Sequence, residues 1–226
     1  MVLEPSQTLA AATALFISIH AVPATALRRS IVGLIGEWPY LLCFSVASIA
    51  CVALMAHAYV HAPSVQLFPG LRPAAWVLMA PALFLLVCGV SVSNPTALKQ
   101  EHLLRKAEPA HGVIRITRHP VTCAMILFGA AHVLARGDSR AALFFGGFAL
   151  LGIGGIVLQE RRKARALGRD WARFAERTSI LPGAAIFARR NSFQPREIGW
   201  VRGLVALSLY LMLLHFHGSA FGLPAY

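Results

Sequence analysis

Residues 114–138 of the chain are IRITRHPVTCAMILFGAAHVLARGD. A polar start that ends in Arg118-His119-Pro120 leads into an apolar run, which contains a second histidine, His132, and ends at Arg136. An imidazole inside hydrocarbon loses its hydration and must find a partner, so a histidine within a membrane helix marks a candidate functional site. This stretch therefore indicates both the class of fold and a place to look for function.

The composition of the whole chain indicates an integral membrane protein. Its 226 residues are 57% hydrophobic and 13% charged, with a mean hydropathy of +0.64, outside the usual balance of soluble domains. A helix needs roughly 20 mostly apolar residues to cross the hydrocarbon core. Suitable runs lie at residues 8–27, 39–60, 73–93, 120–135, 141–159 and 200–218. We predict a single all-α domain over residues 1–226, a polytopic membrane helix bundle with about six transmembrane helices.

The distribution of charge predicts the orientation. Lys and Arg outnumber Asp and Glu by 21 to 9, and they gather at residues 28–29, 94–119 and 160–198. Such segments face the cytoplasm by the positive-inside rule, which places both termini on the non-cytoplasmic side of the inner membrane. Basic residues beside a span are attracted to an anionic leaflet by about 1 kcal/mol each. We therefore expect the lipid bilayer, and not nucleic acid, as the partner.

The longest polar segment, residues 160–198, begins with a helical pattern. Apolar residues recur there at spacings of three and four among Arg and Lys, namely Ala164, Leu167, Trp171 and Phe174. This pattern is typical of an amphipathic helix on the membrane surface. Together with residues 94–119, the segment is expected to roof a site on the cytoplasmic side.

Only two of the nine histidines, His20 and His132, have several apolar neighbours on both sides. Desolvation favours the neutral imidazole, which is also the form that binds a metal or haem iron. On neighbouring helices the two would supply both axial ligands of a haem, and without a C-x-x-C-H motif that haem would be non-covalent. The alternative is that each hydrogen-bonds a backbone carbonyl or a nearby side chain.

The haem hypothesis requires His20 and His132 to lie at the same depth in the membrane. At 1.5 Å per residue, His20 lies roughly 18 Å from the outer end of its span and His132 roughly 6 Å from the outer end of its own. Tilt, or a deep-set fourth helix, would be needed to bring the two to one iron.

A glycine-rich stretch, Gly152-x-Gly154-Gly155, lies within the fifth apolar run. No strand precedes it, so we predict close helix packing there rather than a nucleotide-binding loop.

Three separated motifs follow one another along the chain: Ile116-Thr117-Arg118-His119-Pro120, then Ala131-His132, then RTSILPGAAIF at residues 177–187. In this order they resemble the motifs of the NnrU family, which includes ζ-carotene isomerases. The resemblance implies a non-covalent haem b bound by His20 and His132. It also implies redox-gated cis/trans isomerisation of an apolar, lipid-like polyene. Bacterial members are associated with denitrification, so nitrogen-oxide-linked redox metabolism, or a non-enzymatic membrane factor for denitrification, is also implied.

Two positions depart from the isomerase branch of that family. Ala21 follows His20 where the branch has a serine, and Gly129 stands where the branch has a cysteine in a Cys-x-Ala-His motif. A cysteine ligand that exchanges with histidine is therefore not expected here, whereas His132 itself matches.

A second set of motifs consists of Arg118-His119-Pro120, Gln159-Glu160-Arg161, Gly168-Arg169-Asp170-Trp171 and Leu181-Pro182. Its layout resembles that of a different class of protein, the isoprenylcysteine-type membrane methyltransferases. This resemblance implies that Arg118 and His119 hold a cofactor, S-adenosylmethionine, at the cytoplasmic face. Glu160 stands alone where a pair of acidic residues is usual, and we interpret this similarity as one of fold. Arg118 has a simpler interpretation as a topological anchor at the end of a span.

Overall fold

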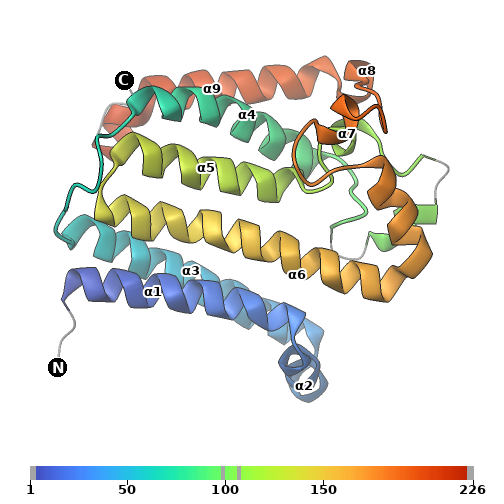
Figure 1. Cartoon of the computed structure of the whole chain (residues 1–226). Helices are drawn as coiled ribbons and strands as arrows, with labels where there is room; N and C mark the ends of the chain where they lie inside the picture. The colour runs from blue at the N-terminus through green and yellow to red at the C-terminus, as the bar shows by residue number, and fades with distance from the viewer. Residues whose placement is uncertain (1–3, 98–99, 106–107, 223–226) are drawn as a thin grey trace.

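The computed structural model describes residues 4–97, 100–105 and 108–222. Apolar helices of the described residues lie side by side in a bundle (Figure 1). They are α1 (Pro5–Ala21), α3 (Glu37–His61), α4 (Arg72–Ser91), α5 (Pro120–Arg136), α6 (Ser139–Arg177) and α9 (Trp200–Phe221). The predicted all-α membrane helix bundle is confirmed: β contact in the described residues is limited to one isolated bridge, between Gln66 and Asp138.

The helices differ in their capacity to cross a membrane alone. Four of those in the described residues, α3, α4, α6 and α9, are long and apolar enough to do so. Helix α5 is a shorter apolar helix of 17 residues. Helix α1 ends at Ala21, and after a 3-10 turn at Val22–Ala24 the chain bends by 78° into α2 (Ala26–Ile35). The first predicted span therefore ends early, because Pro23 lacks the N–H that would continue the helix.

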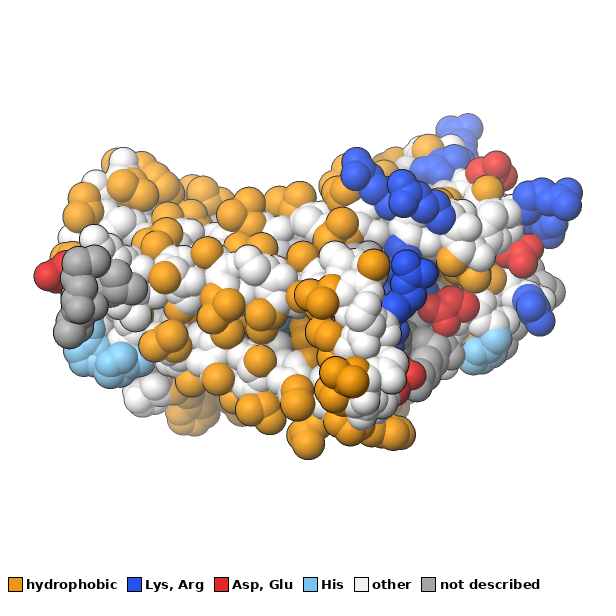
Figure 2. Space-filling view, turned by 90° about the horizontal axis from the view of Figure 1, so that it is seen from below, with side chains coloured by type: hydrophobic (Ala, Val, Ile, Leu, Met, Phe, Trp, Pro, Cys, Tyr) orange, Lys and Arg blue, Asp and Glu red, His pale blue; other side chains and the backbone are white. Residues whose placement is uncertain are grey.

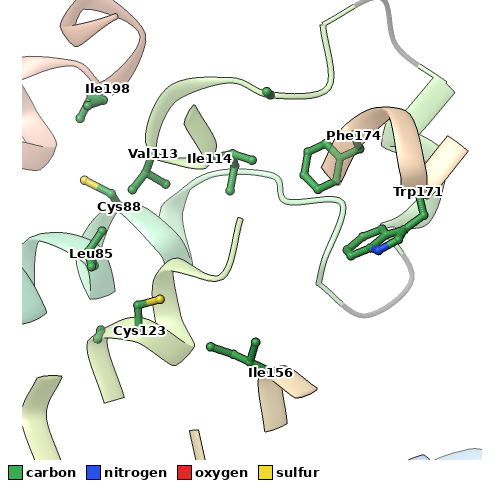
Figure 3. Packing of buried hydrophobic residues seen from close by; sticks show 11 residues of the cluster. Leu85, Cys88, Val113, Ile114, Cys123, Ile156, Trp171, Phe174 and Ile198 are labelled. Carbon is green, nitrogen blue, oxygen red and sulfur yellow. The ribbon is translucent and has the colours of Figure 1, made fainter. Parts of the chain in front are cut away.

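Helix α6 occupies the centre of the bundle. It packs against α5 on one side and against α1 on the other, while α4 packs on α5 and α9, and α3 packs on α1. One apolar cluster lies between α1, α3 and α6 and includes Leu9, Phe16 and Met55. A second cluster, drawn in Figure 3, joins α4, α5 and α6 to the loops at one end of the bundle.

The predicted fifth span and the predicted amphipathic helix form one element, α6, which has 39 residues. Gly168 has φ 50 and ψ −121, a conformation open to glycine, and the helix kinks there. Beyond the kink the chain crosses the end of the bundle (Figure 1). Trp171 and Phe174 are buried in the second apolar cluster. The apolar face of the amphipathic segment thus packs on the protein's own core.

The described residues of 94–119, namely 94–97, 100–105 and 108–119, lie together with residues 160–198 at the end of the bundle that this segment crosses. Short helices occur among them: η2 (Glu101–Arg105), η3 (Gly112–Arg115), α7 (Ala184–Phe187) and α8 (Pro195–Ile198). In Figure 2 Lys and Arg side chains gather at this end, whereas hydrophobic side chains cover the length of the bundle. We call this end the basic roof.

Glycines allow α6 to approach its neighbours closely. A Cβ on Gly129 of α5 would lie 2.5 Å from the carbonyl oxygen of Phe145 in α6, and one on Gly147 would lie 2.5 Å from Thr13 of α1. In the glycine-rich stretch, Gly152 faces Ile126 of α5 at a similarly short distance, as predicted, whereas nothing described lies within 4 Å of a Cβ at Gly154 or Gly155. The order α5, α6, α1 therefore depends on small residues at the contacts.

We expect Gly129→Ala to lower the free energy of unfolding by about 1–3 kcal/mol, because the added methyl group forces α5 and α6 apart. The matched control is Gly154→Ala, since no described atom lies within 4 Å of a Cβ at that position. Alanine there should be neutral or stabilising by up to about 1 kcal/mol. Thermal unfolding of both variants in detergent measures the difference, and equal effects would contradict the close-contact interpretation.

Candidate functional site

The motif Arg118-His119-Pro120 lies where the basic roof meets α5. His119 is the residue before α5, and Pro120 occupies the first helical position, where its missing N–H costs nothing. The preceding backbone is held by residues 179–183: the N–H of Arg118 donates to the carbonyl of Ser179 at 3.0 Å, and the N–H of Gly183 donates to that of Ile116 at 2.8 Å. The motif is thus fixed in place on both sides.

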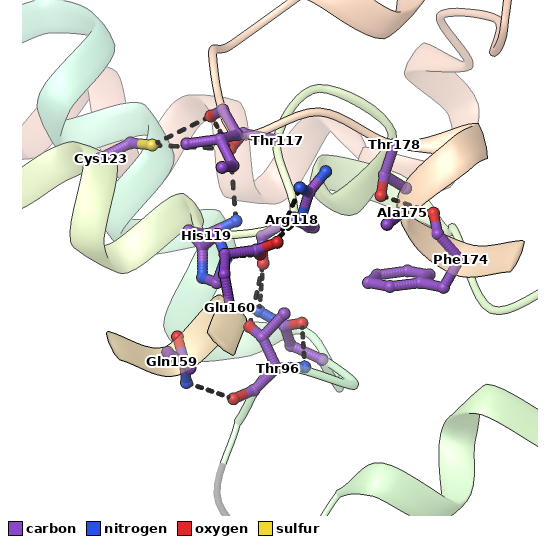
Figure 4. A network of polar contacts seen from close by, with 12 residues as sticks. Thr96, Thr117, Arg118, His119, Cys123, Gln159, Glu160, Phe174, Ala175 and Thr178 are labelled. Atoms are coloured by element: carbon purple, nitrogen blue, oxygen red, sulfur yellow. Dashed lines mark hydrogen bonds and ion pairs between the residues drawn. The ribbon is translucent and has the colours of Figure 1, made fainter. Parts of the chain in front are cut away.

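The side chains of Arg118 and His119 both contact the carboxylate of Glu160 (Figure 4). The Arg118 guanidinium binds it in bidentate fashion, with Nε 2.7 Å from Oε1 and Nη2 2.9 Å from Oε2. The Nε2 of His119 lies 2.6 Å from Oε1. The side chains of Arg118 and His119 are 9% and 1% exposed. A bidentate pair at this depth is a strong, geometrically specific contact.

A second layer of hydrogen bonds supports this centre. The carbonyl oxygen of Arg118 accepts from Thr96 Oγ1 at 2.9 Å and from Asn94 Nδ2 at 3.3 Å. Gln159, next to Glu160 in α6, donates from Nε2 to the carbonyl of Thr96 at 2.7 Å. Asn94 and Thr96 follow α4, so the centre ties together the ends of α4, α5 and the apolar part of α6.

One atom of the centre stands out chemically. Because a carboxylate only accepts hydrogen bonds, the Nε2 of His119 is the protonated nitrogen when the ring is neutral. Its Nδ1 is then a lone-pair acceptor, and it is buried without a partner among the described residues. A buried polar atom without a partner is costly, so Nδ1 of His119 is a candidate contact for a ligand.

Two further ion pairs brace the roof. Lys163 of α6, 2% exposed, donates to Glu101 Oε1 and to the carbonyl of Pro95, both at 2.9 Å. Partial burial raises the pKa of Glu101, but the hydrogen bond and charge of Lys163 outweigh it and hold the pKa below its usual value. At Glu197 the hydrogen bond from Arg115 is the main cause of a lowered pKa, with the Gly112 N–H adding to it.

His20 and His132 have similar local surroundings on different helices. The Nδ1 of His20 lies 2.7 Å from the carbonyl oxygen of Phe16, and the Nδ1 of His132 lies 2.9 Å from that of Phe128. A carbonyl only accepts, so in each ring Nδ1 carries the hydrogen and Nε2 has the lone pair that a metal would take. The hydrogen-bonded alternative considered for each residue thus agrees with the structure, and it leaves Nε2 available.

The structure does not bring His20 and His132 together. Thr13 of α1 and Gly129 of α5 both contact α6 near Gly147, and so lie at one level. His20 lies seven residues beyond Thr13 along α1, toward the basic roof. His132 lies three residues beyond Gly129 along α5, in the opposite direction. At 1.5 Å per residue the offset is about 15 Å. One iron with both as ligands needs the two nitrogens about 4 Å apart, so these residues do not fit a shared haem in this arrangement.

The neighbours of the two rings differ accordingly. His20 contacts Phe16 and Phe44, with ring centroids 4.4 and 5.1 Å away. His132 stacks on Phe145 at 4.4 Å and lies 6.4 Å from the His217 ring of α9. In the described residues no group of three or more His, Cys, Asp or Glu side chains is arranged to hold a metal ion.

The chain matches the family model described as NnrU protein over residues 8–225. The chain belongs to the NnrU family. It is 31% identical over 172 residues to a protein of Arabidopsis thaliana named 15-cis-zeta-carotene isomerase, chloroplastic. That alignment covers 70% of this chain and 44% of the relative, so the chain spans less than half of the relative's length. No solved structure matches the chain.

The methyltransferase resemblance named Glu160 together with Arg118 and His119, but the sequence did not predict their direct contact or the supporting residues of this NnrU chain. Lys163 was missed because it lies between arginines and resembles a solvated charge run. Asn94, Thr96 and Ser179 are ordinary loop residues in the sequence. A signal for the centre was the position of Glu160 at the end of an apolar run, because a carboxylate there needs a cationic partner.

Arg118→Ala leaves the partly buried Glu160 carboxylate without its main partner, so we expect it to cost about 3 kcal/mol of unfolding free energy. The control is Arg177→Ala, which breaks a pair with Glu108 whose side chains are both 60% exposed; its cost should stay below about 1 kcal/mol. Chemical denaturation in detergent compares the two, and similar losses would contradict the structural importance of the Arg118 pair.

Acidification should weaken the roof. The folded-state pKa of Glu197 lies below its ordinary value of 4.5, so its stabilisation is present above that value and is lost as the pH falls through the folded pKa. We expect the melting temperature to drop between about pH 5 and pH 3, and to drop less in Glu197→Gln, which has already lost this contribution. Melting curves across that range test it; parallel pH profiles for both proteins would contradict it.

Proposed function

We propose that this NnrU protein is a membrane isomerase that acts on a long apolar polyene, converting a cis double bond to trans. The proposal rests on one observation above all: the 31% identity over 172 residues to a protein named as a 15-cis-zeta-carotene isomerase. Such a substrate is lipid-like, and it would reach the bundle from the bilayer.

An aromatic cluster between α1, α5 and α6 suits a flat conjugated substrate. The Phe148 ring lies 5.3 Å from Phe16 and 6.0 Å from Phe128. Phe16 in turn lies 4.4 Å from His20, and Phe128 lies 4.4 Å from His132. Aromatic faces bind other π-systems in offset or edge-to-face arrangements. In the proposed function these rings orient the polyene and exclude water, while the two histidines supply polar atoms at either end of the cluster.

Haem b binding remains a prediction from the family resemblance. A bound haem would supply one-electron redox chemistry to the polyene. The pair His20 and His132 does not fit one iron here, so a haem held by this chain requires a different ligand set. The reduced-minus-oxidised spectrum of protein expressed with ample haem tests binding. His20→Ala and His132→Ala, examined singly, test which histidine contributes.

A second candidate function is an S-adenosylmethionine-dependent membrane methyltransferase. It is favoured by the meeting of Arg118, His119 and Glu160, the residues that the methyltransferase resemblance singles out, and by the unpartnered Nδ1 of His119. Calorimetry with S-adenosylmethionine tests it: binding that disappears in His119→Ala supports this function, and no heat of binding removes it.

The non-enzymatic role in denitrification is a third candidate, and it predicts neither isomerase activity nor S-adenosylmethionine binding. Growth on nitrate after deletion of the gene, with pigment analysis of the same strain, separates it from a role in carotenoid chemistry. In all three functions we propose that the protein lies in the inner membrane, with the basic roof in the cytoplasm and both termini outside. Labelling of single cysteines introduced at Arg169 and at His57 reports this orientation.

Vesicles containing the protein should convert 15-cis-ζ-carotene to a product with a trans central bond. Chromatography and absorption spectra measure this conversion. Because Phe128 and His132 face the aromatic cluster, Phe128→Ala and His132→Ala should slow conversion by about tenfold or more through loss of orientation. His57→Ala, which alters an exposed residue of α3 outside the cluster, should leave the rate unchanged. Absence of conversion by the unaltered protein would contradict the proposed isomerase.

A further inference from the structure

A cavity of about 320 Å³ in the basic roof is lined by four arginines. They are Arg115, Arg177, Arg189 and Arg190, and the rest of the lining consists of Glu108, Ala110, Asn191 and Ser192. None of these residues belongs to the Arg118 centre or to the aromatic cluster. The cavity is therefore a second candidate binding site, at the end of the bundle where the basic side chains gather (Figure 2).

The charges of the cavity are only partly balanced. Arg115 is paired with Glu197, and Arg177 makes a longer, exposed contact with Glu108 at 3.4 Å. Arg190 donates to backbone carbonyls at the end of α6, including that of Thr178 at 3.0 Å. In the part of the chain that the structure describes, neither Arg189 nor Arg190 forms an ion pair with a carboxylate. Among the described residues, two positive charges at the cavity thus lack an anionic partner.

The hydrogen bonds of Asn191 also indicate an anionic ligand. Its Oδ1 accepts from Arg115 Nη1 and from the N–H of Ser192, both at 2.8 Å. Its Nδ2, a donor, is buried and has no acceptor among the described residues. A cavity with unbalanced guanidinium groups and a donor without an acceptor favours an oxyanion that accepts several hydrogen bonds, as a phosphate does.

The backbone at Arg189 is strained. Its φ of 55 makes it the sole non-glycine residue with a positive φ in the described ranges. A side chain disfavours this left-handed conformation, which glycine adopts freely. Residues held in such conformations cluster at functional sites. The strained turn places two successive arginines, Arg189 and Arg190, at the rim of the cavity.

Exposed apolar side chains surround these arginines along the chain. Leu181, Phe187 and Phe193 are 71%, 88% and 53% exposed. Bare apolar side chains alternating with basic ones are typical of a surface that inserts at the lipid interface. A small soluble phosphate compound has no apolar groups to contact these side chains, whereas a phospholipid has both a phosphate and acyl chains.

We propose that the arginine-lined cavity binds the phosphate group of an anionic phospholipid in the leaflet on the roof side. Leu181, Phe187 and Phe193 then lie among the acyl chains, and the guanidinium groups of Arg189 and Arg190 contact the phosphate. Basic pockets at the membrane face bind lipid headgroups by this combination of charge and position. This site is independent of the isomerase proposal.

The test measures the melting temperature of the whole protein in detergent as dioleoyl phosphatidylglycerol, dioleoyl phosphatidylcholine or inorganic phosphate is added. A ligand that binds the folded state raises the melting temperature. We expect a saturable rise with phosphatidylglycerol alone. The double variant Arg189→Gln, Arg190→Gln should weaken the apparent affinity by about fivefold for each arginine removed. The control double variant, Arg169→Gln, Arg173→Gln, removes two exposed charges of α6 outside the cavity and should bind as before.

Arg189→Gly separates binding from folding. It removes one guanidinium while relieving the strained φ, so without lipid its melting temperature should equal or exceed that of the unaltered protein, and its response to phosphatidylglycerol should be weaker. Equal responses to both phospholipids, or equal losses in the two double variants, would overturn the proposal. A response to inorganic phosphate that matches the response to phosphatidylglycerol would overturn the lipid as the source of the phosphate.

Discussion

The ion pair between Arg118 and Glu160 fixes the relation between the membrane helices and the roof. Arg118 lies two residues before α5, and Glu160 lies where the apolar part of α6 ends, so the pair sets the register of these two helices at the roof. The carbonyl of Arg118 holds the segment after α4, and its N–H holds the segment after α6. A partly buried ion pair of this kind adds little net stability compared with an apolar contact. It does require one specific arrangement of the two side chains, and so of the helices that carry them.

Hydrophobic length and charge pattern predicted the class of fold well because a bilayer restricts the choice of structure. Each of the six apolar runs formed a helix, and the residues beside them gathered into one basic roof. The sequence did not reveal that α1 ends at Ala21, although Pro23 was visible, since proline is tolerated in many membrane helices. It also did not reveal that Trp171 and Phe174 face the core, because an amphipathic pattern is the same whether its apolar face meets lipid or protein.

The candidate site, too, was predicted from the sequence only in part. Arg118 and His119 were found from a motif, and Glu160 was named with them by the second resemblance; the structure joins all three. The pairing of His20 with His132 depended on which helices are neighbours, which apolar runs do not determine. Packing contacts place α6 between α1 and α5. Small residues such as Gly129 and Gly147 settle that order, and their effect becomes visible once the helices are placed.

The central place of α6 has a consequence for how the chain is made. Helices α1 and α3 form an N-terminal hairpin whose main partner in the bundle is α6. Residues 62–138 are synthesised between the two, so the hairpin enters the membrane long before the helix that covers it exists. Lipid tails must first occupy the face that Phe144 and Phe148 later cover. At this face of the hairpin, assembly is thus an exchange of lipid for protein along α6.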